Sequence, residues 1–550
     1  MPLGIADNAA RTRELQPPSD PPSRSAPPPC RRGRWLPRRP RSFFSRRRAK
    51  AVAACRSLLL AAFGAWAGAA SLHGQAATPA AAAAAEAGGA AAFGRSLVLR
   101  MDRIVADSSR TTFGWLSQAE AVNYTSQGAL ELRVALAPWE GEPKAIRELG
   151  SFTVYGGDLA RHPFPFSAAP EGVPDGYYRW RIEVWDGGTR LAALTQPVVF
   201  AAGLEGKRAE FTRRLAAIDG HESAKASILY PFDLARTINL GRRVYGSAAR
   251  NPEFGLSQAG VPQLYDFSAG LKKSAALLDE LAAGRDPVWR ARGDRVRHYY
   301  LPEADEILPY HVVVPASWDG QSKLPLVFIL HGNSRDQDFY FERDGGIIPR
   351  NAEKHGFMLV CPLGYSPNGG YNYVPFDRER GPRGADAAAA APHSFGTEAK
   401  PTDGVNGSVT PALVRSEWSE QDARQVLALV RQEYPIDSTR IFLLGYSAGG
   451  QGAHYFAQKY AEDWAAIAIG GSNATPGVRY DFGRVRPIPM MLFVGGADTP
   501  NVAPTHALFQ ALKQHGVDVV LHEYPGATHD TAPSAATPDI FDFFAARGHA

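Results

Sequence analysis

Apolar and polar positions follow three different patterns along the chain. Between about residues 95 and 202, short segments such as ALELRVALAPW and GYYRWRIEVWDGG alternate apolar with polar residues, and Asp-Gly and Gly-Gly turn signals separate them. This alternation is typical of strands that bury one face. About 100 residues of this kind predict a small β-sandwich domain of the immunoglobulin or fibronectin type.

The next region, from about 203 to 294, has a helical period. In EFTRRLAAI and AGLKKSAALLDELAAG the apolar residues recur three and four positions apart. That spacing places them on one face of a helix. The region is therefore predicted to be a helical connector, and no chemistry is assigned to it.

From about 295 to 550, nearly continuous apolar segments alternate with amphipathic ones. LPLVFILHG, GFMLVCPLG, RIFLLGYS and IPMMLFVGG are examples of the apolar kind. Such strands, separated by helices, predict an α/β catalytic domain with a mostly parallel sheet covered on both faces. HYYLPEADEILPYHVVV ahead of them predicts an entry hairpin. Residues 371–412 are rich in Gly, Pro, Asp and Ala and predict a long loop over the C-terminal edge of the sheet.

The first 76 residues have the layout of a basic leader followed by a signal peptide. A run of arginines at 46–48 precedes the short apolar run Leu58–Trp66, and small residues follow it. An alanine-rich linker is predicted over 77–94. We expect a secreted or periplasmic protein without a stable membrane span, because the apolar run is too short for one. An uncleaved anchor is the alternative, and residues 1–45 fit either a disordered extension or an over-extended start site.

Charge and cysteine content limit the possible partners. The net charge is +5, but residues 1–57 alone carry 14 Lys or Arg against 3 Asp or Glu, so the remainder carries −6. A mildly acidic body argues against nucleic-acid binding. Cys361 is the one cysteine beyond the leader, so we expect stability to come from packing and not from disulfides.

One five-residue motif suggests a nucleophile. Gly445-Tyr446-Ser447-Ala448-Gly449 follows an apolar strand and opens a helical pattern. A serine in a sharp turn between a strand and a helix, flanked by glycines, is typical of the nucleophile elbow. A lone GxSxG is weak evidence, but this context makes Ser447 a candidate catalytic nucleophile.

A serine hydroxyl needs a base, and the base needs an orienting acid. Asp498 follows the strand at 489–494, and His529 lies beyond the strand at 517–523. The order Ser, Asp, His is the one expected of α/β-hydrolases. The competing residues are His522, His454 and Asp530. They are less suitable because His522 lies within a strand, His454 lies along the helix after Ser447, and Asp530 is next to the proposed base.

The developing oxyanion requires two hydrogen-bond donors. The backbone N–H of Ala448, directly after the nucleophile, is one candidate. The N–H of Asn333, in the loop after LPLVFILHG, is the other, with Ser334 as the alternative. Gly332 permits the sharp turn of that loop, and His331 is interpreted as structural.

At these residues the chain resembles the α/β-hydrolase superfamily. LHGN, PLGYSPNGGYN and EQDARQVLALVRQEYPIDSTRIFLLGYSAGGQGAHYFAQKY are similar to secreted esterases of the feruloyl esterase and polyhydroxybutyrate-depolymerase-like kind. They are also similar to the catalytic domain of prolyl oligopeptidase-type peptidases. The resemblance covers roughly 300–550. It implies an acyl-transfer mechanism without metal or cofactor, and it places Tyr365 and Tyr446 at the substrate cleft. The segment 371–412 has no counterpart in the family.

Three functions are compatible with these sequence features. The leading hypothesis is a carboxylic-ester hydrolase acting on plant-polymer esters, polyesters or small acyl esters. The alternative is a prolyl oligopeptidase-type serine peptidase, although no repeated blade motif precedes the catalytic region. A non-enzymatic binding protein on the hydrolase scaffold is the third. Separately, the aromatic segment Tyr177–Trp185 of the predicted sandwich is a candidate carbohydrate-binding surface. The oligomeric state is not predicted.

Overall fold

The computed structural model describes ten stretches of the chain. They are residues 92–118, 129–138, 147–155, 159, 162–240, 265–333, 335–366, 369–372, 416–472 and 480–547. The predictions for the leader and for most of the linker lie outside these residues. The same holds for the loop from 373 to 412 and for Ser334 as an oxyanion donor.

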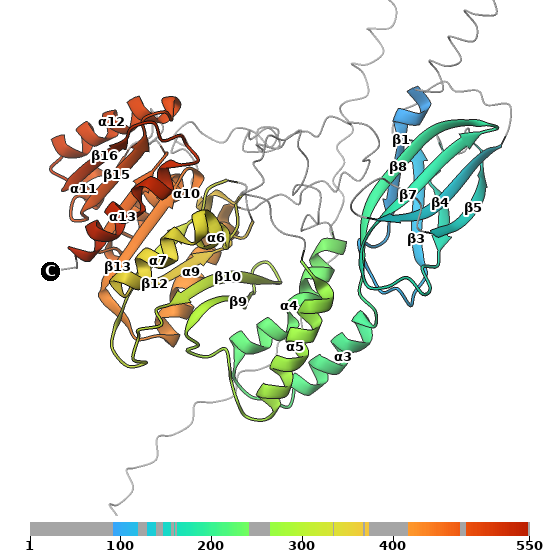
Figure 1. Ribbon diagram of the computed structural model, residues 1–550, viewed down its shortest axis with the longest axis horizontal. Coiled ribbons are helices and arrows are strands. Elements are labelled where there is room, and N and C mark those ends of the chain that lie inside the picture. The colour runs from blue at the N-terminus through green and yellow to red at the C-terminus, as the bar shows by residue number, and fades with distance from the viewer. Residues whose placement is uncertain are drawn as a thin grey trace, which may run out of the picture. The chain divides into compact units, whose positions relative to one another are not determined.

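The C-terminal part is built on an eight-stranded sheet with the order β16-β15-β14-β13-β11-β12-β10-β9 (Figure 1). The strands β9 and β10, the first two in the sequence, form the predicted entry hairpin. β10 is antiparallel to both of its neighbours in the sheet, β9 and β12. All the other pairs are parallel. The strands are β9 (Gly293–Leu301), β10 (Glu306–Val314), β11 (Leu324–Leu330), β12 (Met358–Pro362), β13 (Ile436–Tyr446), β14 (Ala466–Gly470), β15 (Met490–Gly495) and β16 (Val519–Tyr524).

Helices cover both faces of this sheet, as the continuous apolar strands predicted. Every residue of β11 is buried. Phe328 and Leu330 belong to the core cluster on one face, and Val327 and Ile329 to the cluster on the other. The first face is packed by α9 (Ser416–Glu433), α10 (Ala448–Lys459) and α12 (Thr499–Gln514), and the second by α7 (Ile347–His355) and α13 (Ala532–Ala545). The short helices α6 (Phe339–Glu342) and α11 (Phe482–Val485) complete this part. The predicted α/β-hydrolase fold is confirmed.

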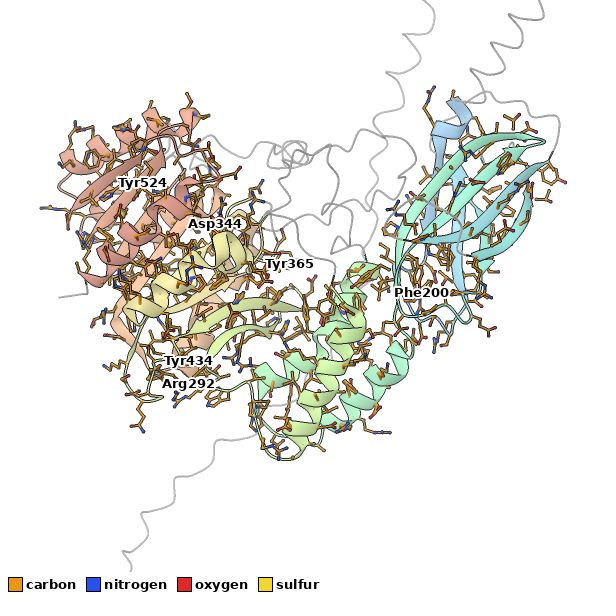
Figure 2. All side chains as sticks on the ribbon, in the orientation of Figure 1. Phe200, Arg292, Asp344, Tyr365, Tyr434 and Tyr524 are labelled. Carbon is orange, nitrogen blue, oxygen red and sulfur yellow. The ribbon has the colours of Figure 1, made fainter. Side chains whose placement is uncertain are left out.

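Two mainly antiparallel sheets form the predicted sandwich. One has the order β1-β3-β6 and the other β2-β8-β7-β4-β5. The strands are β1 (Leu97–Met101), β2 (Val105–Ala106), β3 (Thr112–Gln118), β4 (Leu130–Pro138), β5 (Arg147–Val154), β6 (Phe164–Ala168), β7 (Gly176–Asp186) and β8 (Thr189–Phe200). Trp180 is fully buried in the shared core beside Phe200, which Figure 2 labels. It therefore takes no part in a carbohydrate-binding surface, and Phe113 and Trp115 on β3 are the exposed large aromatic residues of the two sheets.

Three helices lie in the region predicted to be a connector: α3 (Leu204–Leu215), α4 (Glu222–Asn239) and α5 (Phe267–Ala282). They share one apolar cluster, in which the rings of Phe211 and Phe232 meet edge to face. Asp266 caps α5 by accepting a hydrogen bond from the N–H of Ala269. The boundaries proposed for the domains stay predictions.

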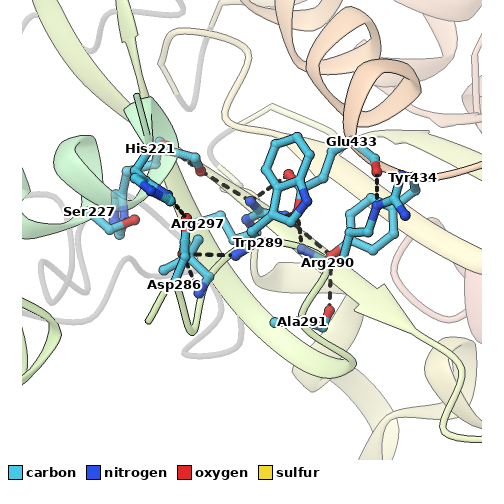
Figure 3. A network of polar contacts seen from close by, with 12 residues as sticks. His221, Ser227, Asp286, Trp289, Arg290, Ala291, Arg297, Glu433 and Tyr434 are labelled. Carbon is cyan, nitrogen blue, oxygen red and sulfur yellow. Dashed lines mark hydrogen bonds and ion pairs between the residues drawn. The ribbon is translucent and has the colours of Figure 1, made fainter. Parts of the chain in front are cut away.

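A buried ion pair ties β9, an edge strand of the eight-stranded sheet, to the end of α9 (Figure 3). Arg297 on β9 and Glu433 at the end of α9 are both nearly inaccessible, and two guanidinium nitrogens lie 2.6 and 2.7 Å from the carboxylate oxygens. The Tyr434 hydroxyl donates to the carbonyl of Ala291. Removing one partner of such a pair leaves a buried charge unpaired, which costs about 3–5 kcal/mol.

Among the described residues, no helix is long and apolar enough to cross a membrane.

Candidate active site

Ser447 occupies a strained turn between β13 and α10. Its φ is 56° and its ψ is −121°, a backbone conformation that residues other than glycine rarely adopt. Its N–H donates to the carbonyl of Gly470 at the end of β14, at 3.0 Å. The turn is therefore held by the sheet, and it presents the Ser447 hydroxyl at the C-terminal edge, where active sites of parallel sheets form.

The glycines around this serine are required by close backbone approach. A Cβ added at Gly445 would lie 2.4 Å from the carbonyl oxygen of Gly449. A Cβ added at Gly449 would lie 2.0 Å from the carbonyl oxygen of Leu330, at the end of β11. Neither distance is sterically possible without moving the backbone, so a side chain at either position would push α10 away from the sheet.

Asp498 and His529 converge on Ser447 from two further strand ends. Asp498 lies between β15 and α12 and is 5% exposed. His529 lies between β16 and α13. The His529 Nε2 atom is 3.0 Å from the Ser447 Oγ atom, and its Nδ1 atom is 2.7 Å from Asp498 Oδ2. This line of contacts is the geometry needed to move a proton from a hydroxyl to an imidazole held by a carboxylate.

A fourth residue, which the sequence reasoning missed, completes this line. The amide nitrogen of Asn501, in the first turn of α12, donates to both carboxylate oxygens of Asp498, at 2.9 and 3.0 Å. The carboxylate is thus held from two sides, by an imidazole and by an amide. Its orientation toward His529 is therefore fixed by α12 as well as by the strand.

The loop after β11 lies directly against Ser447. A Cβ added at Gly332 would be 3.4 Å from the Cβ of Ser447, so the loop passes it at van der Waals distance. Asn333 is exposed and lines the same cavity as Ser447. The other proposed donor, Ala448, is the first residue of α10, whose leading N–H groups have no partner within the helix.

His331 is buried and hydrogen-bonded to backbone groups of two loops. Its Nε2 atom lies 2.7 Å from the carbonyl oxygen of Leu363, and its Nδ1 atom lies 2.9 Å from that of Gly332. Burial lowers the pKa of its imidazole. Its backbone N–H donates to the hydroxyl of Tyr371. His331 and Tyr371 together therefore hold the start of the loop that carries Asn333.

A cavity of about 130 Å³ opens beside the Ser447 hydroxyl. Tyr446 lines it, and the Tyr446 hydroxyl donates to the carbonyl of His529 at 2.6 Å, which ties His529 to β13. The residues that line the cavity are Gly332, Asn333, Arg335, Phe339, Tyr340, Arg343, Tyr446, Ser447, His529 and Asp530.

Tyr365, the other residue expected at the cleft, lies elsewhere in the fold. It is buried, its hydroxyl donates to Glu306, and its ring contacts Trp418 of α9 (Tyr365 is labelled in Figure 2). It is not among the residues that line the described cavity. Its conformation, with φ at 59°, serves the turn after β12. The packing therefore supplies no substrate contact for this residue.

The competing bases and acids have other partners. The His522 Nδ1 atom lies 3.2 Å from Asp539. His454 is buried against the Tyr480 hydroxyl, and burial lowers its pKa to about 4. Asp530 points toward Arg335, at 3.7 Å. Among the described residues no group of three or more His, Cys, Asp or Glu side chains is arranged to hold a metal ion.

Comparison with known proteins places a family match on this part of the chain. Residues 349–537 match the model of the dienelactone hydrolase family. This match, on the sheet described above, supports the prediction of an α/β-hydrolase enzyme that acts on carboxylic esters. No curated protein sequence matches the chain.

Three solved structures illustrate the structural similarity. A thermostable esterase is 20% identical with a TM-score of 0.34; the match covers 46% of this chain and 63%, less than two thirds, of that protein. A ferulic acid esterase from Anaeromyces mucronatus is 15% identical, with 46% and 90% covered and a TM-score of 0.32. An S-formylglutathione hydrolase from Agrobacterium tumefaciens is 18% identical, with 47% and 96% covered and a TM-score of 0.32.

Proposed function

We propose that the chain hydrolyses carboxylic esters through a triad of Ser447, His529 and Asp498 and a covalent acyl-enzyme. The observation that carries the proposal is the continuous line of contacts from the Ser447 hydroxyl through the imidazole to the Asp498 carboxylate, at 3.0 and 2.7 Å. The backbone strain at Ser447 supports it, because a serine with a positive φ costs about 1–3 kcal/mol and such strained residues cluster at active sites.

The first half of the reaction forms the acyl-enzyme. The Ser447 oxygen attacks the ester carbonyl carbon while its proton passes to His529 Nε2. The carbonyl oxygen becomes an oxyanion, which accepts hydrogen bonds from the N–H groups of Ala448 and Asn333; each such donor is worth about 2.7–4 kcal/mol in the transition state. The bond to the alcohol oxygen then breaks, and the alcohol leaves with the proton from His529.

The second half returns the enzyme to its starting state. Water gives a proton to His529 and attacks the acyl carbon, and the bond to Ser447 breaks as the serine oxygen regains the proton. Asp498 remains ionised throughout and stabilises the transient imidazolium. Tyr446 holds the base through its hydrogen bond to the carbonyl of His529. No step requires a metal or a cofactor.

For the substrate we propose plant-polymer esters, polyesters or small acyl esters, and for the location the cell exterior or the periplasm. The similarity of the motifs around Ser447 to feruloyl and depolymerase-like esterases supports the first. The arginine run and the apolar run Leu58–Trp66 of the leader support the second. N-terminal sequencing of the protein recovered from the medium and the periplasm of the expressing cell tests the location.

Replacement of the nucleophile tests the mechanism. Ser447→Ala should lower the hydrolysis of p-nitrophenyl acetate by at least about a thousandfold and abolish labelling by a fluorophosphonate. Ser472→Ala is a matched control, because Ser472 is a buried serine that packs near α10 at Gly450 and lies outside the triad; it should keep both properties. Esterase activity that survives in Ser447→Ala contradicts the proposal. Cleavage of a proline p-nitroanilide without ester hydrolysis would instead favour the peptidase.

A further inference from the structure

The turn after β12 carries three left-handed residues that are not glycine. Tyr365, Tyr371 and Asn372 have φ values of 59°, 54° and 60°. This backbone conformation is uncommon for residues other than glycine, and bulky side chains such as tyrosine rarely adopt it. Such strain persists only where the surrounding groups hold the backbone in place. Residues 364–366 and 369–372 are called the β12 turn.

Two side chains of α9 hold the backbone of the β12 turn. The N–H of Tyr371 donates to the Ser419 hydroxyl at 2.9 Å, and the N–H of Tyr365 donates to Asp422 at 2.6 Å. Ser419 and Asp422 are both fully buried. They lie three positions apart, so they project from one face of the helix. Both contacts are therefore shielded from water, which could otherwise replace either acceptor.

The third left-handed residue has an acceptor on the same helix. The side-chain amide of Asn372 donates to Glu420 at 2.6 Å. The turn also packs tightly on α9, since a Cβ added at Gly369 would lie 2.5 Å from the Ser419 Oγ atom. All three left-handed residues are thus held by side chains of one short stretch, residues 419–422.

The β12 turn contacts the loop proposed to stabilise the oxyanion. The Tyr371 hydroxyl accepts a hydrogen bond from the N–H of His331 at 3.1 Å, and Asn333 follows two residues later. The contacts from Ser419 to Tyr371 and from Tyr371 to His331 form a continuous line from α9 to the loop beside Ser447. None of the α9 side chains is among the residues that line the described cavity. Any effect of α9 on catalysis therefore passes through the β12 turn.

We propose that Ser419 and Asp422 are positioning residues of the oxyanion site. They hold the β12 turn, and Tyr371 passes its position on to the backbone of His331 and so to Asn333. The inference rests on the proposed function and names the element that sets the geometry of the second oxyanion donor. Such a donor acts only when it is held within about 0.5 Å of its productive place. Removing an acceptor on α9 lets the left-handed residues relax, which lowers catalysis without touching the substrate.

The kinetic test removes one acceptor at a time. In Ser419→Ala the Tyr371 N–H loses its partner, and kcat for p-nitrophenyl acetate should fall about tenfold with KM within about twofold. Asp422→Leu removes the acceptor of the Tyr365 N–H and should act in the same way, whereas Asp422→Asn keeps a carbonyl oxygen there and should retain most of kcat. Ser274→Ala, at a buried serine of α5, is the matched control and should leave kcat unchanged. A kcat for Ser419→Ala within about twofold of the wild type overturns the inference.

A double-mutant cycle separates this route from a general loss of packing. If Ser419 acts through the Tyr371 hydroxyl, Ser419→Ala should lower kcat less than about threefold in the Tyr371→Phe background, compared with about tenfold in the wild type. Effects on kcat that simply multiply, or a KM that changes as much as kcat, would show that Ser419 only supports the fold and would overturn the inference.

Hydrogen exchange keeps the result independent of the proposed catalysis. In the Ser447→Ala background, the peptide that contains His331 should gain about one faster-exchanging amide when Ser419→Ala is added, because the His331 N–H loses its fixed acceptor. The same peptide should not change in Ser274→Ala. Unchanged exchange in Ser419→Ala contradicts the inference even if the triad is correct. Ester hydrolysis that survives Ser447→Ala contradicts the triad even if the exchange responds.

Discussion

The hydroxyl of Tyr371 accepts a hydrogen bond from the backbone N–H of His331 at 3.1 Å, and this contact fixes the start of the loop proposed to stabilise the oxyanion. Tyr371 is fully buried, and its backbone is left-handed, with φ at 54°. Glycines make room for it, since a Cβ at Gly364 or Gly452 would lie 2.9 Å from Tyr371 atoms. The residue is thus wedged between β11, the turn after β12 and the helix α10.

Replacing Tyr371 with phenylalanine should reduce catalysis more than substrate binding. The ring still fills the space, but the loop with Asn333 loses its fixed hydrogen bond. An oxyanion donor acts in the transition state alone, so we expect kcat for p-nitrophenyl acetate to fall about tenfold, or about 1.4 kcal/mol, with KM within about twofold. Tyr480→Phe is the control, because the Tyr480 hydroxyl contacts His454 on α10, the helix against which Tyr371 packs. An equal fall in kcat in both variants would mean that general packing, and not the loop, is affected.

Gly449 tests the close approach of α10 to the sheet. In Gly449→Ala the new Cβ would lie 2.0 Å from the carbonyl oxygen of Leu330, and backbone cannot yield locally as a side chain does. We expect destabilisation by about 3 kcal/mol or more and esterase activity at least a hundredfold lower. Gly206→Ala, at a helical glycine with open space around it, should be neutral or slightly stabilising. Chemical denaturation and activity of both variants check this, and a stable, active Gly449→Ala would contradict the described geometry.

Asn501 is expected to orient the acid of the triad. Asn501→Ala removes the donor that holds both oxygens of Asp498, and we expect kcat/KM to fall about tenfold. In Asn501→Asp, kcat/KM should fall further, since two carboxylates at hydrogen-bond distance cannot both ionise freely. Steady-state kinetics across pH 5 to 9 measures both. An Asn501→Ala enzyme as active as the wild type would show that the His529 contact alone holds Asp498.

Much of the fold was predictable because a strand that is buried on both faces forms a continuous apolar segment in the sequence. The all-apolar segments around Phe328 and Leu443 became central parallel strands. The sandwich was predicted less completely. β3 is hard to predict because its exposed positions carry the aromatic residues Phe113 and Trp115, and β6 is hard to predict because it contains Pro165. A strand with aromatic residues at its exposed positions, or with a proline, does not show the regular alternation of apolar and polar residues by which strands are predicted.

The site divides in the same way. The order of Ser447, Asp498 and His529 was readable because each follows a strand whose C-terminal end lies at one edge of the sheet. Arg335 was not readable, since its place beside Ser447 depends on how the loop between β11 and α6 folds back. Tyr365 illustrates the opposite error. A motif resemblance suggested a cleft, whereas a left-handed turn directs the side chain toward Glu306.

His311 should make the stability of the fold depend on pH. Its Nδ1 atom lies 2.7 Å from Asp338 and its Nε2 atom 2.6 Å from Asp294, while its ring stacks on Phe341. Burial alone would lower the pKa of this imidazole, but the two carboxylates outweigh burial and raise the pKa to about 9. An unfolded histidine titrates near 6.5. The folded state therefore favours the charged ring. Its contribution is complete below about pH 6.5 and disappears as pH rises through about 9.

We expect the free energy of unfolding to fall by about 3 kcal/mol between pH 6.5 and pH 9.5 from this group, since 1.4 kcal/mol corresponds to one unit of pKa shift. Urea denaturation at several pH values measures the change. His311→Gln isolates it, because glutamine reaches one carboxylate without titrating, so the difference between wild type and variant should shrink with rising pH. A difference between the two proteins that stays constant from pH 6.5 to 9.5 would show that His311 is not charged in the folded state.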